Sequence, residues 1–170
     1  MAVPEDSPRV VVRSCAPSDV AEVHALIVEL ARYERAEKEV ALTVETLLSD
    51  MAEGRFECFV AEASGQIVGI ALHHARYSTW KGLTWYLEDL VVTESWRGQG
   101  VGRSLFLAVV AHARSVNAKR LEWQVLDWNE SAIGFYKSLG ASLTDTWLNG
   151  RLTDEDLATL PSPANFASHG

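Results

Sequence analysis

Three glycines at alternate positions constrain the fold of this chain more than any other feature. They lie in the segment Arg97-Gly98-Gln99-Gly100-Val101-Gly102, between an apolar run at residues 85–92 and an amphipathic run that begins near Val101. Glycine lets a ligand approach the backbone closely, and the first amides of a helix attract phosphate through their partial positive charge. A strand, a glycine-rich turn and a helix in this order therefore predict a phosphate-binding loop.

The spacing of these glycines disfavours two common nucleotide motifs. Gly98-x-Gly100-x-Gly102 lacks the G-x-G-x-x-G spacing of dinucleotide-binding folds, and no Lys-Ser or Lys-Thr pair follows it as in a P-loop. A glycine-rich turn without a chemical role is the alternative interpretation. The position of the turn between a strand and a helix favours the functional interpretation.

Size and charge limit the class of protein. The chain has 170 residues, 48% hydrophobic and 22% charged, so we expect one globular domain over residues 1–170. A net charge of -8 disfavours nucleic-acid binding, which needs a basic face, and suits a cationic small substrate or plain solubility. No apolar run approaches ~20 residues, so we expect no membrane span. Residues 1–10 lack the apolar core of a signal peptide, so we expect a cytoplasmic protein.

The cysteines and histidines do not have the spacing of a metal site. Cys15 and Cys58 form neither a CxxC pair nor a disulfide framework, and we expect two small thiols, buried or half-buried, in a reducing compartment. His73 and His74 are neighbours that would point to opposite faces of a strand. We therefore expect no metal.

Hydropathy periods along the chain predict a mixed α/β sheet with helices on both faces. Helices are expected after Ser18 as N-cap, from Thr43 to Gly54, over residues 101–117 and from Asn129 to Gly140. Strands are expected at residues 10–13, 56–62, 66–77, 85–92 and 121–126, with a final strand or hairpin at residues 142–152 and a frayed tail from Pro161.

At this point the chain resembles a known family. Arg97-x-x-Gly100-x-Gly102 is similar to the acetyl-CoA loop of the GCN5-related N-acetyltransferases (GNAT), whose pattern is Gln/Arg-x-x-Gly-x-Gly/Ala. The resemblance implies the GNAT fold, a mixed and mostly antiparallel sheet of about six to seven strands with a splayed strand pair that holds the cofactor. Five further segments resemble the diamine and thialysine acetyltransferase branch: Glu29-Leu30-Ala31-Arg32-Tyr33-Glu34, Tyr77-Ser78-Thr79-Trp80-Lys81-Gly82, Tyr86-Leu87-Glu88-Asp89, Leu126-Asp127-Trp128-Asn129-Glu130 and Phe135-Tyr136-Lys137.

The resemblance implies acetyl-CoA as co-substrate. The loop amides would hold its pyrophosphate, and the backbone of two strand residues would pair with the pantetheine arm like an added strand. Arg103 and Lys137 would meet the outer phosphate, although solvated surface charges are an equal alternative for both. The cofactor-binding candidates are Leu90, Val92, Arg97, Gly98, Gln99, Gly100, Val101, Gly102, Arg103, Asn129, Tyr136 and Lys137.

Glu88 and Tyr136 are the candidate catalytic residues. An alkylammonium, whose pKa is near ~10.4, must lose a proton before its nitrogen can attack a thioester. Glu88 lies in an otherwise apolar strand, where strict alternation places it on one face with Tyr86 and Leu90. A carboxylate there favours a general base acting through water, and a strand carboxylate paired with Arg or Lys is the alternative. The resemblance makes Tyr136 the general acid for the CoA thiolate; a tyrosine packed on the core is its alternative.

The acceptor pocket follows from the resemblance as well. Glu34 and Asp89 match positions that face the cationic acceptor in the diamine branch. Tyr33, Trp80 and Trp128 could supply aromatic walls, where cation–π contact contributes ~0.5–2 kcal/mol. For Tyr33 and Glu34, the alternative is a helix end in solvent.

Ser78 departs from the spermidine/spermine enzymes, which have Asp at the corresponding position. The loop is closer to enzymes that acetylate the side-chain amine of thialysine, so we expect a lysine-like amino acid or a small diamine and low affinity for spermidine. Cys58 is not placed by any motif to carry an acyl group, which favours direct transfer in a ternary complex.

Two other functions remain open. One is a non-catalytic module that binds CoA or an amine, and the other is an acetyltransferase for protein N-termini or lysines. By analogy with related enzymes we expect a homodimer, with the contact carried by residues 144–160.

Overall fold

The chain divides into two compact units, Met1–Gln124 and Val125–Gly170. Alternating apolar residues and tight turns build the sheet of the first unit. The computed structural model describes residues 9–160. The frayed tail expected from Pro161 lies outside the described residues, as do residues 1–8 of the N-terminal segment for which no signal peptide was expected. The sheet has the order β1-β2-β3-β4-β5, antiparallel except for the β4–β5 pair, which is parallel. The strands are β1 (Val10–Ser14), β2 (Glu57–Ala63), β3 (Gln66–Ser78), β4 (Gly82–Val92) and β5 (Leu121–Glu122).

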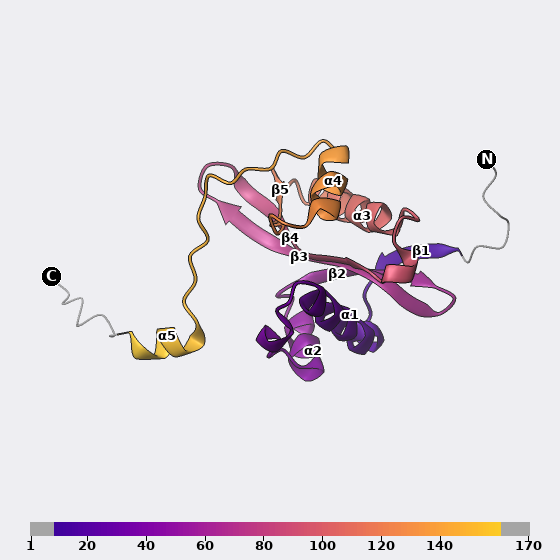
Figure 1. Cartoon of the computed structure of the whole chain (residues 1–170), viewed down its shortest axis with the longest axis horizontal. Helices are drawn as coiled ribbons and strands as arrows, with labels where there is room; N and C mark the ends of the chain where they lie inside the picture. Colours follow the sequence, from indigo (N-terminus) through magenta and orange to yellow (C-terminus); the bar gives the residue numbers. More distant parts are fainter. Residues whose placement is uncertain (1–8, 161–170) are drawn as a thin grey trace, which may run out of the picture. The chain divides into compact units, whose positions relative to one another are not determined.

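The α/β fold with helices on both faces is confirmed, with fewer strands than expected. The described residues hold five strands, and β5 is two residues long where a strand over residues 121–126 was expected. The final strand or hairpin expected at residues 142–152 is wrong, because the described chain has no strand there. Helices α1 (Val20–Tyr33) and α2 (Val44–Ala52) lie on one face of the sheet and α3 (Val101–Ser115) on the other (Figure 1).

The helix caps are partly as expected. Thr43 caps α2, since its hydroxyl accepts a hydrogen bond from the Thr46 amide at 3.2 Å. Ser18 does not cap α1, because a 3-10 turn over Pro17–Asp19 precedes the helix. There the Asp19 carboxylate accepts the Ala16 amide at 2.7 Å instead.

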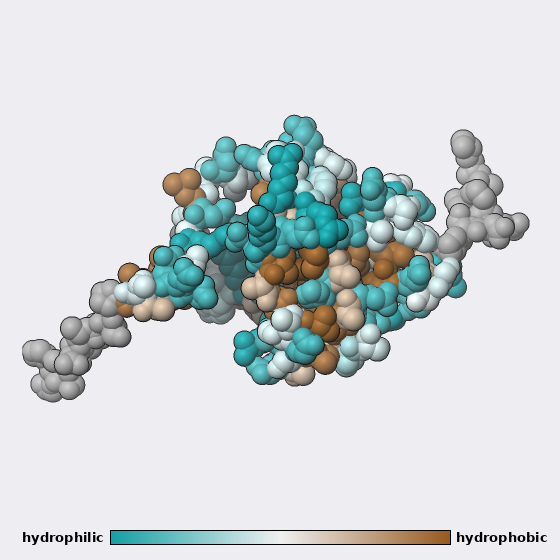
Figure 2. All heavy atoms as spheres, turned by 60° about the horizontal axis from the view of Figure 1, so that its bottom comes forward, coloured by the Kyte–Doolittle hydropathy of each residue, from teal (hydrophilic) through white to brown (hydrophobic). Residues whose placement is uncertain are grey.

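Two apolar layers hold the helices on the sheet. Figure 2 brings the α1 and α2 side forward and shows brown, hydrophobic atoms gathered near the middle of this face among teal ones. On the α3 side, the Trp85 indole N–H donates to Nδ1 of the buried His73 at 2.9 Å, and His112 of α3 stacks near Trp85 at 4.7 Å between ring centroids. The core between the sheet and α1/α2 contains Val20, Val23, Leu26, Leu47, Cys58, Val60, Ile67, Ile70, Leu72 and Val91.

The second unit contains two short helices, α4 (Glu130–Ser138) and α5 (Asp154–Thr159). Asn129 caps α4 as expected, because its side chain accepts the Ala132 amide at 3.1 Å. Over the whole described chain, no helix has the length and apolar character needed to cross a membrane. Residues 9–160 also contain no group of three or more His, Cys, Asp or Glu side chains placed to hold a metal ion.

Candidate active site

The glycine turn forms the N-terminus of α3 and is exposed. Gly98 and Gly100 have φ angles of 74° and 84°, in the left-handed region that disfavours residues with a Cβ. Gly100 is the N-cap of α3 and provides no side-chain cap, and the first turn carries no acidic residue. The first amides of a helix have no intrahelical acceptor. The turn therefore offers an anion both N–H donors and the positive end of the helix dipole.

Arg97, at the start of this turn, is exposed but makes contacts with β4 and α1. Its Nε donates to the Val92 carbonyl oxygen at 2.8 Å. Its guanidinium lies 5.6 Å from the centre of the Tyr33 ring and 3.8 Å from a carboxylate oxygen of Glu29. Arg97 thus ties the turn to the end of β4 and to α1.

Strands β4 and β5 separate beside the turn. Their register contains only the pairs Trp85–Leu121 and Tyr86–Glu122. Beyond Tyr86, β4 continues for six residues to Val92, while β5 ends at Glu122. The β4 edge from Leu87 onward therefore has no partner in β5. This splay leaves backbone groups available to an extended ligand, although the Val92 carbonyl oxygen already accepts a hydrogen bond from Arg97.

A β-bulge sets the position of Glu88. The register of β3 with β4 pairs His73 with Leu87 and Leu72 with Asp89, so Glu88 is an extra residue. The expectation that strict alternation puts Glu88 on one face with Leu90 is wrong, because the bulge shifts the alternation between them. The Glu88 side chain is 56% exposed, which makes its carboxylate accessible to water.

Asp89, the next residue of β4, has a half-buried carboxyl group. Burial, with the nearby negative charges of Glu88 and Glu34, raises the pKa of Asp89 to about 6. Burial also raises the pKa of Glu34, at the C-terminal end of α1. Three carboxylates from α1 and β4 thus interact electrostatically, and a bound cation would relieve the cost of charging Asp89.

The other predicted site residues differ in their exposure and belong to both units. Trp80, in the turn between β3 and β4, is 80% exposed. In the second unit, Tyr136 is buried in α4 with its ring 5.1 Å from that of Phe135. Lys137, Arg103 and Trp128 are exposed. In the first unit, Arg97 of the glycine turn contacts Tyr33 and Val92, and Asp89 interacts with Glu34 and Glu88. The second unit contains Trp128, Asn129, Tyr136 and Lys137.

Sequence reasoning missed His74. Its Nε2 lies 3.4 Å from a carboxylate oxygen of Glu88, and its ring centre lies 5.4 Å from that of Tyr86. The available signal was the β3–β4 hairpin: if Ser78 pairs with Gly82, the antiparallel register places His74 opposite Tyr86. The contact with Glu88 depends on the bulge, which has no signal in the sequence.

Comparison with known proteins identifies the fold and the family. The model described as the acetyltransferase (GNAT) family matches residues 20–141. Among solved structures, an aminoglycoside N-acetyltransferase in complex with CoA superposes with a TM-score of 0.71 at 20% identity, over 89% of this chain and 99% of that one. This structural likeness concerns the fold.

Sequence relatives match along most of their length. The thialysine N-epsilon-acetyltransferase of Mus musculus is 36% identical over 162 residues, which cover 88% of this chain and 95% of the relative. The protein of the same description from Bos taurus is 39% identical over 142 residues, covering 78% of this chain and 84% of the relative. A spermidine/spermine N(1)-acetyltransferase-like protein 1 of Homo sapiens is 30% identical over 88% of this chain and 23% of its own length.

Proposed function

The chain belongs to the GNAT family of acetyltransferases, and from that premise we propose that it transfers the acetyl group of acetyl-CoA to a primary amine of a small cationic acceptor. The favoured acceptor is a lysine-like amino acid such as thialysine, or a small diamine. One observation carries this proposal: the carboxylates of Glu34, Glu88 and Asp89 interact beside the splayed end of β4.

The residues of the first unit fit acetyl-CoA. The turn at the N-terminus of α3, which is exposed at Gly98–Gly100, suits the pyrophosphate. The open β4 edge from Leu87 to Val92 suits the amides of the pantetheine arm. The hydrogen bond from Arg97 to the Val92 carbonyl oxygen fixes the turn to the end of β4 and so supports this arrangement. Bound there, acetyl-CoA supplies the thioester.

We propose that Glu88 accepts the proton of the acceptor ammonium through water. Its exposed carboxylate and its position in the bulge support this role, since a water molecule has room beside it. The neutral nitrogen then attacks the thioester carbonyl carbon within a ternary complex, and the carbon–sulfur bond breaks. Tyr136 donates its phenolic proton to the departing thiolate and regains a proton from water, and the nitrogen loses its second proton to water as the amide forms.

Tyr136→Phe is expected to lower kcat about tenfold, with little change in affinity for acetyl-CoA. The loss is moderate because a thiolate, with a conjugate thiol pKa near ~8.5, is a good leaving group that needs only a hydrogen bond or proton. Steady-state kinetics and titration calorimetry with acetyl-CoA separate the two quantities. Phe135→Leu, at the neighbouring helix position, is the control for packing, and equal losses in both variants would remove Tyr136 from the chemistry.

A screen of amines by CoA release tests the proposed acceptor. We expect turnover with thialysine, lysine or diaminopropane to exceed turnover with spermidine, because Ser78 lacks the second anionic anchor. Ser78→Asp is the matched variant: the Ser78 hydroxyl accepts the Trp80 and Lys81 amides at 3.3 and 3.2 Å, and an Asp carboxylate can accept the same bonds. This variant is expected to shift kcat/KM toward spermidine.

The same screen distinguishes the two alternatives. Acetyl-CoA binding without CoA release for any amine would favour a non-catalytic module. Release with N-terminal peptides alone would favour an acetyltransferase for proteins. Spermidine turnover equal to that of the best small amine would contradict the assignment of the acceptor.

We also propose that the protein is a homodimer joined through residues 144–160. Trp147 is 78% and Leu148 96% exposed, and a backbone without a strand partner in the described chain can pair with a second copy. Light scattering at micromolar concentration is expected to give the mass of a dimer for the native chain and of a monomer for Trp147→Ser/Leu148→Ser. A monomeric native chain would contradict this proposal and leave the acetyltransferase assignment standing.

A further inference from the structure

Two cysteines that the acetyltransferase chemistry does not use lie opposite each other. Cys15 directly follows β1, and its amide donates to the Cys58 carbonyl oxygen at 2.8 Å. The last pair of the β1–β2 ladder is Ser14 with Phe59, so Cys15 and Cys58 continue the antiparallel register by one step. Side chains directly opposite in an antiparallel pair lie on the same face of the sheet.

The Cα spacing at this position lies within the range of disulfides. Hydrogen-bonded antiparallel pairs have Cα atoms ~5.5 Å apart, within the ~4.4–6.8 Å range. Their Cβ atoms are ~4.5–5.5 Å apart and must approach to ~3.5–4.5 Å when the bond forms. Cys58 is buried in the core below α1, whereas Cys15 packs against that core and is partly exposed. One thiol of the pair can therefore be reached from solvent, and the other is protected.

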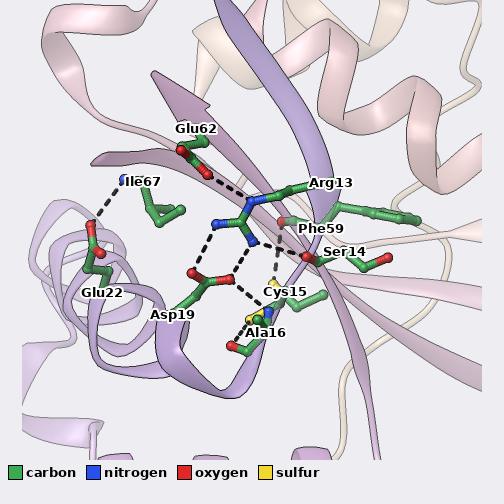
Figure 3. A network of polar contacts seen from close by, with 10 residues as sticks. Arg13, Ser14, Cys15, Ala16, Asp19, Glu22, Phe59, Glu62 and Ile67 are labelled. Atoms are coloured by element: carbon green, nitrogen blue, oxygen red, sulfur yellow. Dashed lines mark hydrogen bonds and ion pairs between the residues drawn. The ribbon is translucent and has the colours of Figure 1, made fainter. Parts of the chain in front are cut away.

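An ion-pair network holds Cys15 in this position (Figure 3). On one side of Cys15, Arg13 binds Asp19 at 2.6 and 3.0 Å and Glu62 at 2.8 Å. On the other side, the Ala16 amide donates to Asp19 at 2.7 Å. The strand end before Cys15 and the turn after it are thus fixed to the same carboxylate, which keeps the sulfur of Cys15 beside that of Cys58.

The two sulfurs differ in acidity. The Cys58 thiol can donate to a Cys15 thiolate, which lowers the pKa of Cys15, and the Arg13 charge acts in the same direction against the effects of burial and Asp19. The pKa of Cys58 is raised by the same hydrogen bond and by burial. A thiolate is the reactive form of cysteine, so Cys15 is the nucleophile of the pair and Cys58 the resolving thiol.

We propose that Cys15 and Cys58 are a redox modification site, which a hydroperoxide oxidises reversibly to an intrachain disulfide. The Cys15 thiolate attacks a peroxide oxygen, the O–O bond breaks, the alkoxide or hydroxide leaves and takes up a proton, and Cys15 becomes a sulfenic acid. The Cys58 sulfur then attacks the Cys15 sulfur, the S–O bond breaks, and water leaves with the proton of Cys58. Two thiols lose two electrons, and the hydroperoxide is reduced to an alcohol, or to water, plus one water.

Treatment of the full-length chain with hydrogen peroxide tests the proposal. We expect titratable thiols to fall from two to none, the intact mass to decrease by two hydrogens, and peptide mapping to recover a Cys15–Cys58 cross-link that dithiothreitol reverses. In Cys58→Ala, dimedone is expected to trap Cys15 as a sulfenic acid, and Cys15→Ser is expected to react far more slowly. Should Cys58→Ala not fold, the mass and peptide map of the native chain still decide.

Three results would overturn the proposal: thiols that stay unmodified, a Cys15 that gains oxygen without a cross-link, or a disulfide between chains instead of within one. None of these results would contradict the proposed acetyltransferase function, which is tested separately by CoA release, because neither cysteine belongs to the proposed catalytic or binding machinery.

Discussion

Replacing Glu88 with glutamine is expected to lower kcat about a hundredfold, the lower end of what a general base contributes. The amide keeps the size and the exposure of the side chain but cannot take a proton from the acceptor ammonium. The reaction then depends on acceptor molecules that are already neutral, and these become more abundant as pH rises toward the amine pKa near ~10.4. The pH optimum is therefore expected to move upward in Glu88→Gln.

The chain contains a matched control for this variant. Glu57 of β2 is a strand carboxylate that is 53% exposed and lies 3.3 Å from His112, as Glu88 is 56% exposed and lies 3.4 Å from His74. Glu57→Gln is expected to keep the native kcat and pH profile in the CoA-release assay. If both glutamine variants behave alike, or if Glu88→Gln keeps the native rate, Glu88 is not the base.

Asp89→Asn is expected to stabilise the protein at neutral pH while it weakens acceptor binding. Burial and two neighbouring carboxylates raise the pKa of Asp89 from 3.8 to about 6, a difference that corresponds to about 3 kcal/mol. Asparagine has nearly the same shape and no charge to bury. The melting temperature at pH 7.5 is therefore expected to rise by roughly 5–10 °C.

The pH dependence of this effect has a definite sign. Between about pH 4 and pH 6 the folded protein keeps a proton on Asp89 that the unfolded chain has released, so the free energy of unfolding falls as pH rises through this window. Above about pH 6 the penalty is complete and constant. The difference in melting temperature between Asp89→Asn and the native chain should thus shrink as pH falls from 7 to 4.

Kinetics and a neighbouring variant complete this test. Without the charge of Asp89, the KM for the cationic acceptor is expected to rise, while acetyl-CoA affinity stays the same. Glu88→Gln, one residue away and exposed, removes only one of the causes of the raised Asp89 pKa and is expected to raise the melting temperature by less than Asp89→Asn does. A lower melting temperature for Asp89→Asn at pH 7.5, or a difference that does not depend on pH, would contradict the buried-charge account.

Local signals in the sequence identified most of the elements around the site. Alternating apolar residues predicted β2 and β3, and Thr43 and Asn129 marked two helix starts through their side-chain caps. The glycine turn was recognisable because the positive φ of Gly98 and Gly100 favours glycine. These features depend on interactions between residues close in the sequence, which is why a single chain reveals them.

The extent of the sheet could not be read in the same way. Residues 142–152 have the composition of a strand, but a strand forms only where another backbone pairs with it, and the described chain provides no such pairing. The short β5 has the same cause, since its ladder with β4 ends after Tyr86. Hydropathy therefore overestimated the number of strands.

By itself, the sequence determined the glycine turn at the start of α3 and the family resemblance, and it supplied the candidate residues for the acceptor site. Only the tertiary structure decided that Glu88 is exposed and Asp89 half-buried: Glu88 is the extra residue of the bulge, and Asp89 interacts electrostatically with Glu34 and Glu88. The same is true of Cys15 and Cys58, which no motif connects and which the β1–β2 register brings face to face. Periodicity describes one strand at a time, whereas a bulge and a cross-strand pair arise from the hydrogen-bond register between two strands.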